Sequence, residues 1–142
     1  MLKLIIDTNV LVSALIQRNY PFLVVDFVLM KRQVELCLSD DLLKEYIEVL
    51  NRIKFFKYPD YEIKSKILLS DIEKVGTIYF PSVVINIVND SSDNRLLELA
   101  ETCNANYLIT GNTRHFSMSE YKETRIVLPR EFWEIEITNT NE

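Results

Sequence analysis

The chain opens with a short apolar run, Leu4 to Ile6, that ends at Asp7 and is followed at once by Thr8-Asn9 and a second apolar stretch. The first run predicts a buried strand and the second a helix, so an α/β unit is expected at the start. In open α/β sheets, ligands bind beyond the carboxyl ends of the strands, which places Asp7 on the functional edge. Because a buried carboxylate is costly unless it is paired, hydrogen-bonded or bound to metal, Asp7 is expected to have partners there.

Segments with strand-like and helix-like patterns alternate along the rest of the chain. Apolar residues at helical spacing cover 22–30, 39–50, 60–75 and 93–104, and a short helix from Pro129 is expected to end near Trp133. The expected strands are 34–38, 107–110 and 125–128, whereas 83–88 can be a strand or an extended connection. This alternation predicts an α/β fold, a three-layer α/β/α sandwich around a central parallel sheet of four to five strands. The domain is expected to span 1–134, and a polar tail 135–142.

Two of the predicted helices are expected to bring acids to the same edge. Glu45 lies near the apolar stripe of the helix over 39–50. Asp93 falls in the first turn of the helix over 93–104, where the helix dipole favours negative charge, and Ser91 or Ser92 is expected to cap that helix. Asp90 is explained by turn chemistry and is the lesser candidate for the site.

Asn112 follows the predicted strand over 107–110 and offers one more side-chain oxygen. Together with Asp7, Glu45 and Asp93 it would form a set of oxygen ligands of the kind that hard divalent cations prefer. The pattern therefore predicts a Mg²⁺ or Mn²⁺ site in which these four residues are both metal ligands and catalytic residues. Without metal, the clustered acids would repel one another, and at least one pKa is expected to rise.

The segments that carry these residues resemble the PIN-domain family, in particular its short single-domain members that act as toxins of toxin–antitoxin pairs. The matching segments are 4–14, 42–46, 90–97, 108–116 and 126–132, and together they cover roughly 1–134. The resemblance implies a metal-dependent ribonuclease in which Asp7, Glu45 and Asp93 match the family's first three acids. Asn112 stands where many members carry a fourth Asp. An RNA substrate, a small antitoxin and a homodimer are further implications.

Each acid also has an ordinary structural explanation. Asp7 can cap the helix that follows it. Glu45 can lie on a solvated helix face or pair with Lys44 or Arg52. Asp93 can serve the helix dipole alone.

The uncharged candidates have alternatives of the same kind. Thr8 and Asn9 can orient Asp7 or cap a helix, and Asn112 is a good turn former. His115, the only histidine, is a candidate general base, although metal-activated water needs none and a structural role is favoured. The segment 52–58 interleaves cations with aromatic rings that can stack on unpaired bases, but a helix end with buried Phe is the favoured interpretation.

Composition limits the number of domains, the partners and the cellular compartment that are expected for the chain. Its 142 residues suffice for one domain with a core, and no apolar run approaches the roughly 20 residues that span a bilayer, so no membrane role is expected. A formal net charge of −5 argues against a generic nucleic-acid binder, but bound cations would reverse the sign at the acidic site. Cys37 and Cys103 lie in apolar runs without disulfide or metal-ligand spacing, which favours a reducing cytoplasm.

Two other functions remain open at this level. A phosphatase similar to the haloacid-dehalogenase-like enzymes would use Asp7 as nucleophile, Thr110 to bind phosphate and Lys122 to stabilise it. The Asn9 side chain disfavours this chemistry, because a second acid normally stands two residues after the nucleophile. A catalytically weak PIN-like module that binds RNA or protein is the other alternative, and Asn112 in place of an acid permits it.

Overall fold

Five parallel strands and one antiparallel edge strand form the central sheet. The computed structural model describes residues 1–30 and 33–138, and within them the strand order is β3-β2-β1-β4-β6-β5. The strands are β1 (Leu2–Ile6), β2 (Val34–Leu38), β3 (Gly76–Ile78), β4 (Tyr107–Ile109), β5 (Glu120–Tyr121) and β6 (Thr124–Val127). β1 lies in the middle, parallel to β2 and β4, and only β5 runs antiparallel to its neighbour.

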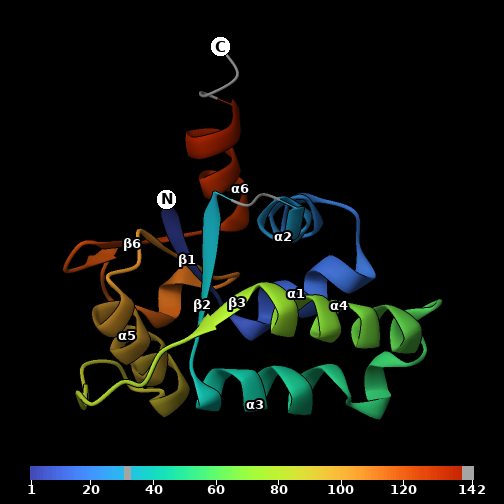
Figure 1. The fold of residues 1–142 in the computed structure, drawn as a ribbon, viewed down its shortest axis with the longest axis horizontal. Coiled ribbons are helices and arrows are strands. Elements are labelled where there is room, and N and C mark those ends of the chain that lie inside the picture. The colour runs from blue at the N-terminus through green and yellow to red at the C-terminus, as the bar shows by residue number, and fades with distance from the viewer. Residues whose placement is uncertain (31–32, 139–142) are drawn as a thin grey trace.

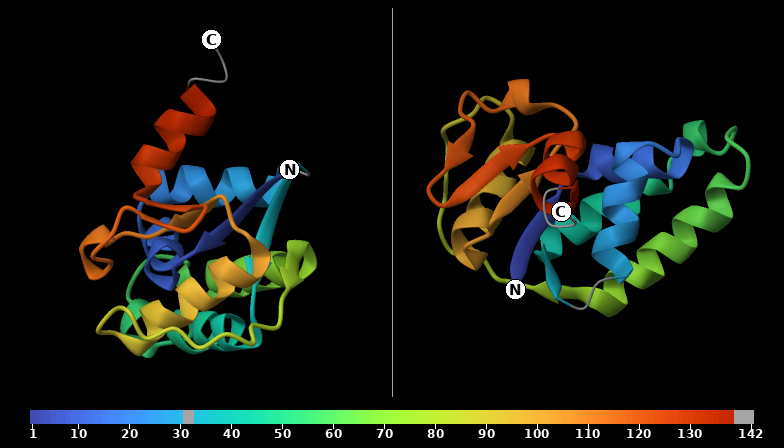
Figure 2. Two further views of the ribbon diagram at one scale, coloured as in Figure 1. Left: turned by 90° about the vertical axis from the view of Figure 1, so that its left-hand side faces the viewer. Right: turned by 90° about the horizontal axis from the view of Figure 1, so that it is seen from above.

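Helices cover both faces of this sheet. They are α1 (Thr8–Ile16), α2 (Tyr20–Met30), α3 (Asp40–Leu50), α4 (Tyr61–Val75), α5 (Ser91–Cys103) and α6 (Pro129–Phe132). Figure 1 shows α5 on one side of β1 and β2 and α2 with α4 on the other, and the view from above in Figure 2 agrees. The α/β/α sandwich with a mainly parallel sheet is therefore confirmed.

The apolar runs of the central strands are buried because both faces are covered. Leu4, Ile5 and Ile6 are at most 2% exposed, and the three residues of β4 are buried as well. A strand enclosed by helices on both sides needs continuous apolar sequence rather than alternation. The start of the chain has this pattern, which explains why β1 occupies the centre of the sheet.

Two short strands, β3 and β5, were not expected from sequence. β3 directly follows α4, and a Cβ added at Gly76 would lie only 2.3 Å from Leu38 Cδ1, so glycine allows the close approach of β3 to β2. Segment 83–88 is the extended connection and not a strand. Side chains of α5 hold it, because Glu98 Oε2 accepts a hydrogen bond from Ile85 N at 2.9 Å and Asn94 Oδ1 accepts two more from this segment.

The C-terminal helix is longer than predicted. α6 ends at Phe132, but the chain continues as a π-helix over Trp133–Thr138 that projects from the body in Figures 1 and 2. Contacts of the Phe27 ring with Phe132 and Trp133, at centroid distances of 6.2 and 6.4 Å, anchor its base. The expected polar tail over 135–142 thus begins with helical residues, and 139–142 lie outside the described part. Within the described residues, no helix is long and apolar enough to cross a membrane.

Candidate metal centre

Asp7 lies at the carboxyl end of β1, fastened to the neighbouring strand. Its backbone N donates to Ile109 O at 2.8 Å, and its Oδ2 accepts a hydrogen bond from the buried Thr110 hydroxyl at 2.8 Å. Although Asp7 occupies the N-cap position of α1, its side chain makes no capping hydrogen bond. The carboxylate is therefore held between β1 and β4, toward the functional edge, and does not serve the helix.

α3 brings Glu45 to the same edge. The Thr8 hydroxyl donates to Glu45 Oε2, and the fully buried Tyr46 hydroxyl donates to Ile6 O, the last residue of β1. These two contacts fix α3 against the end of the strand. The alternative partner Arg52 is engaged elsewhere, because it pairs with Glu48 at 3.1 Å. Glu45 therefore lies beside Thr8 at the end of β1, and its role as a metal ligand stays a prediction.

Asp93 enters from the first turn of α5. The N-cap of this helix is Asp90, whose Oδ1 accepts from Ser92 N at 2.7 Å, so the expected cap at Ser91 or Ser92 was wrong. Because Asp90 already serves this backbone group, Asp93 is free to point elsewhere. Its side chain is 8% exposed, and Oδ2 is buried without a hydrogen bond.

Asn112 and His115 lie on the Asp93 side of the site: His115 contacts Asp93, and Asn112 contacts His115. The Asn112 Oδ1 atom accepts from Arg114 N at 3.2 Å and so caps the short 3₁₀ helix Thr113–His115. The Asn112 Nδ2 atom lies 2.9 Å from His115 Nε2, and His115 Nδ1 lies 3.4 Å from Asp93 Oδ2. Asn112 therefore contacts the site through the imidazole in this structure, and a direct ligand role for it stays a prediction.

Burial and mutual repulsion disfavour ionisation of the acids. The pKa of Asp7 is raised to about 6, chiefly by burial; the Thr110 hydrogen bond opposes the rise, and the charges of Asp93 and Glu45 add to it. The pKa of Asp93 is also raised, first by burial and then by the charge of Asp90. The expectation that at least one pKa rises in the absence of metal is confirmed.

The side chains at this edge fit a hard divalent cation. All of the groups that Asp7, Glu45 and Asp93 present are carboxylate oxygens, and the buried Asp93 carboxylate lacks a full set of hydrogen-bond partners. Across 1–30 and 33–138, however, no three His, Cys, Asp or Glu side chains form a group that could hold an ion by themselves. Mg²⁺ and similar ions take one or two carboxylates and complete their shell with water, so this donor set suits them better than zinc.

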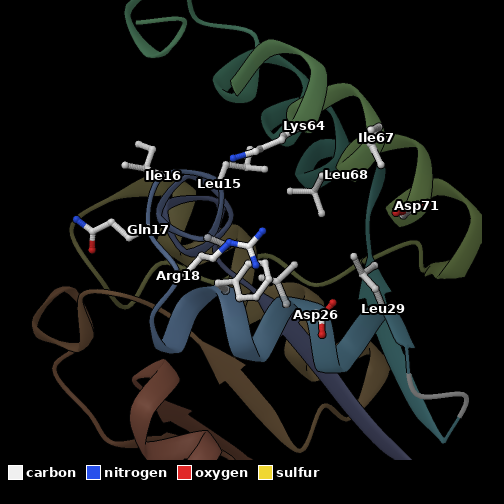
Figure 3. Close-up of a pocket in the computed structure, with 13 residues that line it drawn as sticks. Leu15, Ile16, Gln17, Arg18, Asp26, Leu29, Lys64, Ile67, Leu68 and Asp71 are labelled. Carbon is white, nitrogen blue, oxygen red and sulfur yellow. The ribbon is translucent and has the colours of Figure 1, made fainter. Parts of the chain in front are cut away.

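Two cavities differ in whether they border the predicted site residues. A cavity of about 170 Å³ between α3 and α5 is lined by Glu45 together with Ser39 and Arg95. A cavity of about 260 Å³ between α1, α2 and α4 contains none of the predicted site residues, and its walls are mainly apolar (Figure 3).

Three positioning residues were not identified as such from sequence. Tyr46 carries the only clear signal, a polar aromatic residue on the apolar stripe of α3 next to Glu45. Thr110 was considered only for phosphate binding, and its hydroxyl instead holds Asp7. Asn94, 2% exposed, holds the segment that precedes Asp90.

Two alternative interpretations lose support in this structure. Lys122, the cation that a phosphatase mechanism would require, pairs with Glu101 in the last turn of α5, at the opposite end of that helix from Asp93. In the segment 52–58, the rings of Phe55 and Phe56 pack against the buried Tyr61 ring, at centroid distances of 5.5 and 6.2 Å. Neither Lys122 nor the segment 52–58 therefore adds a cation or an aromatic ring for nucleotide binding to the acidic edge.

Comparison with known proteins agrees with this geometry. The uncharacterized protein MJ1680 of Methanocaldococcus jannaschii is 28% identical over 142 aligned positions, which cover 94% of this chain and 90% of that protein. A family model described as PIN domain matches residues 3–114, a span that includes Asp7, Glu45, Asp93 and Asn112. That span is well over half of the 142 residues, and the chain belongs to the PIN-domain family.

Proposed function

We propose that this protein is a Mg²⁺- or Mn²⁺-dependent endoribonuclease that hydrolyses RNA phosphodiester bonds. PIN domains are generally nucleases and typically use divalent metals. The observation that carries the proposal is the electrostatic state of the edge: Asp7, with a pKa raised to about 6, shares its surroundings with Glu45 and Asp93. Burial first, and then the neighbouring charges, disfavour the ionised form of Asp7, and a bound cation would offset both effects.

The residues of the chain hold and orient the proposed site. Asp7, Glu45 and Asp93 would hold the ion, which when bound activates water and stabilises the charge that develops on phosphate oxygens. Thr110 fixes the Asp7 carboxylate, and Thr8 fixes that of Glu45. Asn112 completes the proposed set, either as a ligand or through His115.

Cleavage of single-stranded RNA by the purified protein tests this proposal. Cleavage is expected with Mg²⁺ or Mn²⁺ and should be lost on addition of a chelator. The variant Asp7→Asn is expected to be inactive yet folded, whereas Asp26→Asn, which changes an exposed carboxylate on α2, should retain activity. Metal-independent cleavage, or no cleavage over a broad panel of RNAs, would contradict the proposal.

The biological setting is proposed from the resemblance to single-domain toxins. In that setting the protein acts in the cytoplasm, is neutralised by a small antitoxin and forms a homodimer. The two free cysteines are buried, as expected for a reducing compartment. Expression that arrests growth with the wild-type chain, but not with Asp7→Asn, would support the toxin role; equal growth in both cases would count against it.

A PIN-like module that binds RNA or a protein without efficient cleavage is the second candidate. The absence, among the described residues, of three acids close enough to hold an ion together favours it. Tight RNA binding and measurable Mn²⁺ affinity without turnover would identify this module. Turnover that depends on all three acids would exclude it.

A further inference from the structure

We propose that Asn112 and His115 form a positioning pair for Asp93, in which Asn112 selects the Nδ1–H tautomer of His115 and so turns an N–H toward the Asp93 carboxylate. The tautomer follows from the hydrogen bonds alone. Its consequence for metal binding rests on the proposed function.

The orientation of the Asn112 amide is set by the backbone. Arg114 N can only donate, so the side-chain atom 3.2 Å from it must be the amide oxygen. This leaves the amide nitrogen facing His115 Nε2 at 2.9 Å. The usual ambiguity between the oxygen and nitrogen of an Asn side chain is therefore resolved at this position.

The amide in turn decides which imidazole nitrogen carries the proton. Because Asn112 Nδ2 donates, Nε2 of a neutral His115 must accept and cannot carry hydrogen. The proton then resides on Nδ1, which lies 3.4 Å from Asp93 Oδ2. Neutral imidazoles in unstructured chains prefer the other tautomer, so the arrangement selects the less common form.

The recipient of this N–H has no other partner among the described residues. Asp93 Oδ2 is buried and makes no hydrogen bond, while the other acids nearby can only repel it. At 3.4 Å the contact is longer than a normal N–H···O hydrogen bond and acts mainly as a directed electrostatic attraction. An N–H aimed at one carboxylate oxygen leaves the other oxygen for a cation, as groups behind metal ligands commonly do.

The tautomer can be read directly, because the chain contains a single histidine. Nitrogen NMR of the metal-free protein, at a pH where the imidazole is neutral, is expected to show hydrogen on Nδ1 and an unprotonated Nε2. In Asn112→Ala the signal should shift toward the Nε2–H form. The control Asn86→Ala, at an exposed position whose side chain makes no hydrogen bond within 1–30 and 33–138, should leave it unchanged. Hydrogen on Nε2 in the wild-type protein would overturn the inference.

Metal affinity measures the consequence without requiring turnover. Calorimetric titration with Mn²⁺ is expected to show a loss of roughly 10-fold in affinity for His115→Ala, the lower end of what groups behind metal ligands contribute. His115→Asn places an amide N–H near the position of Nδ1 and should retain most of the affinity. His115→Gln places its amide near Nε2 and should not. The positioning role would be contradicted if all three variants bound Mn²⁺ with the same affinity. It would also be contradicted if His115→Asn and His115→Gln lost the same amount of affinity.

Asn112→Asp separates this role from direct ligation. A carboxylate can still accept from Arg114 N, but it would accept from Nε2–H of His115 and reverse the tautomer. If Asn112 acts by positioning, Asn112→Asp should reverse the tautomer and weaken Mn²⁺ binding. If the variant instead keeps Nδ1–H and binds Mn²⁺ more tightly, position 112 is a metal ligand. If the wild-type protein shows Nδ1–H but binds no Mn²⁺, the proposed metal-dependent function is wrong. The selection of the tautomer by the positioning pair would still be supported.

Discussion

At Asp7, stability and the proposed chemistry make opposite demands: the metal site needs an ionised carboxylate, but ionisation of this buried group destabilises the folded protein. Burial and two neighbouring acids raise its pKa to about 6, against about 3.9 for an unperturbed Asp. A carboxyl group with a raised pKa in the folded state binds its proton more tightly there than in the unfolded chain. Its ionisation therefore weakens the fold as pH rises from about 4 to 6, and the loss persists above that range.

Asp7→Asn should stabilise the metal-free protein at neutral pH. A rise of about two pKa units corresponds to roughly 2–3 kcal/mol, an upper value for the gain in the free energy of unfolding above pH 6. The gain should vanish near pH 4, where wild-type Asp7 is already protonated. Urea unfolding with chelator at pH 4.5 and 7.5 measures it, and Asp26→Asn on the exposed face of α2 is the control. A gain that is equal at both pH values would contradict the electrostatic explanation.

The two acids at the start of α5 should differ sharply when neutralised. Asp93→Asn and also Glu45→Gln should raise the Mn²⁺ concentration needed for half-maximal cleavage, because each removes charge from the proposed site. Asp90→Asn should change it much less, since an Asn side chain can still cap the helix through Ser92 N. Cleavage assays over a Mn²⁺ series compare them, and equal effects at 90 and 93 would refute the distinction.

At the scale of elements, α5 connects the site to the extended segment that leads into it. Asn94 lies next to Asp93 and satisfies three backbone groups, accepting from Ile87 N and Val88 N at 3.0 Å and donating to Val88 O at 2.8 Å. Backbone groups of a connection without strand partners need such bonds when they are buried. This one side chain therefore holds the segment that precedes Asp90.

Asn94→Ala should release that segment and weaken the fold. Loss of three hydrogen bonds to largely buried backbone groups is expected to lower the free energy of unfolding by roughly 2–4 kcal/mol. Hydrogen exchange should accelerate at the amides of Ile87 and Val88, and the exposed Asn86→Ala is the matched control. Unchanged exchange at these amides would show that another contact holds the segment.

At the scale of the whole molecule, binding of a cation should appear as stability. Asp7 directly follows β1, whereas Glu45 and Asp93 lie on α3 and α5, so an ion held by these acids would link separate parts of the fold. A ligand present at 100 times its dissociation constant stabilises the folded state by about 2.7 kcal/mol. Thermal unfolding should shift upward with Mn²⁺ and return with chelator, and Asp93→Asn should reduce the shift. If Asp7→Asn and Asp93→Asn both kept a shift as large as that of the wild-type protein, the ion would bind elsewhere.

The sequence by itself determined the local elements and the layer order. The continuous apolar run Leu4 to Ile6 predicted a buried strand, which is β1, and helical spacing in 39–50 and 93–104 matched α3 and α5 closely. The same patterns placed Asp7, Glu45 and Asp93 on elements that meet at one edge. These predictions depend on the order of apolar and polar residues close together along the chain, and the sequence shows that order directly.

Only the tertiary structure decided which polar groups contact one another. The Thr110 hydroxyl reaches Asp7 across 103 positions of the chain, and the partner of Thr8 is 37 residues away. The short strands β3 and β5 exist because neighbouring strands offer hydrogen bonds to them, since their own two or three residues carry no periodic signal. The roles of Asn112 and His115 likewise depend on a backbone N–H and a buried carboxylate that the fold brings together, because the direction of a side chain is set by packing rather than by its sequence neighbours.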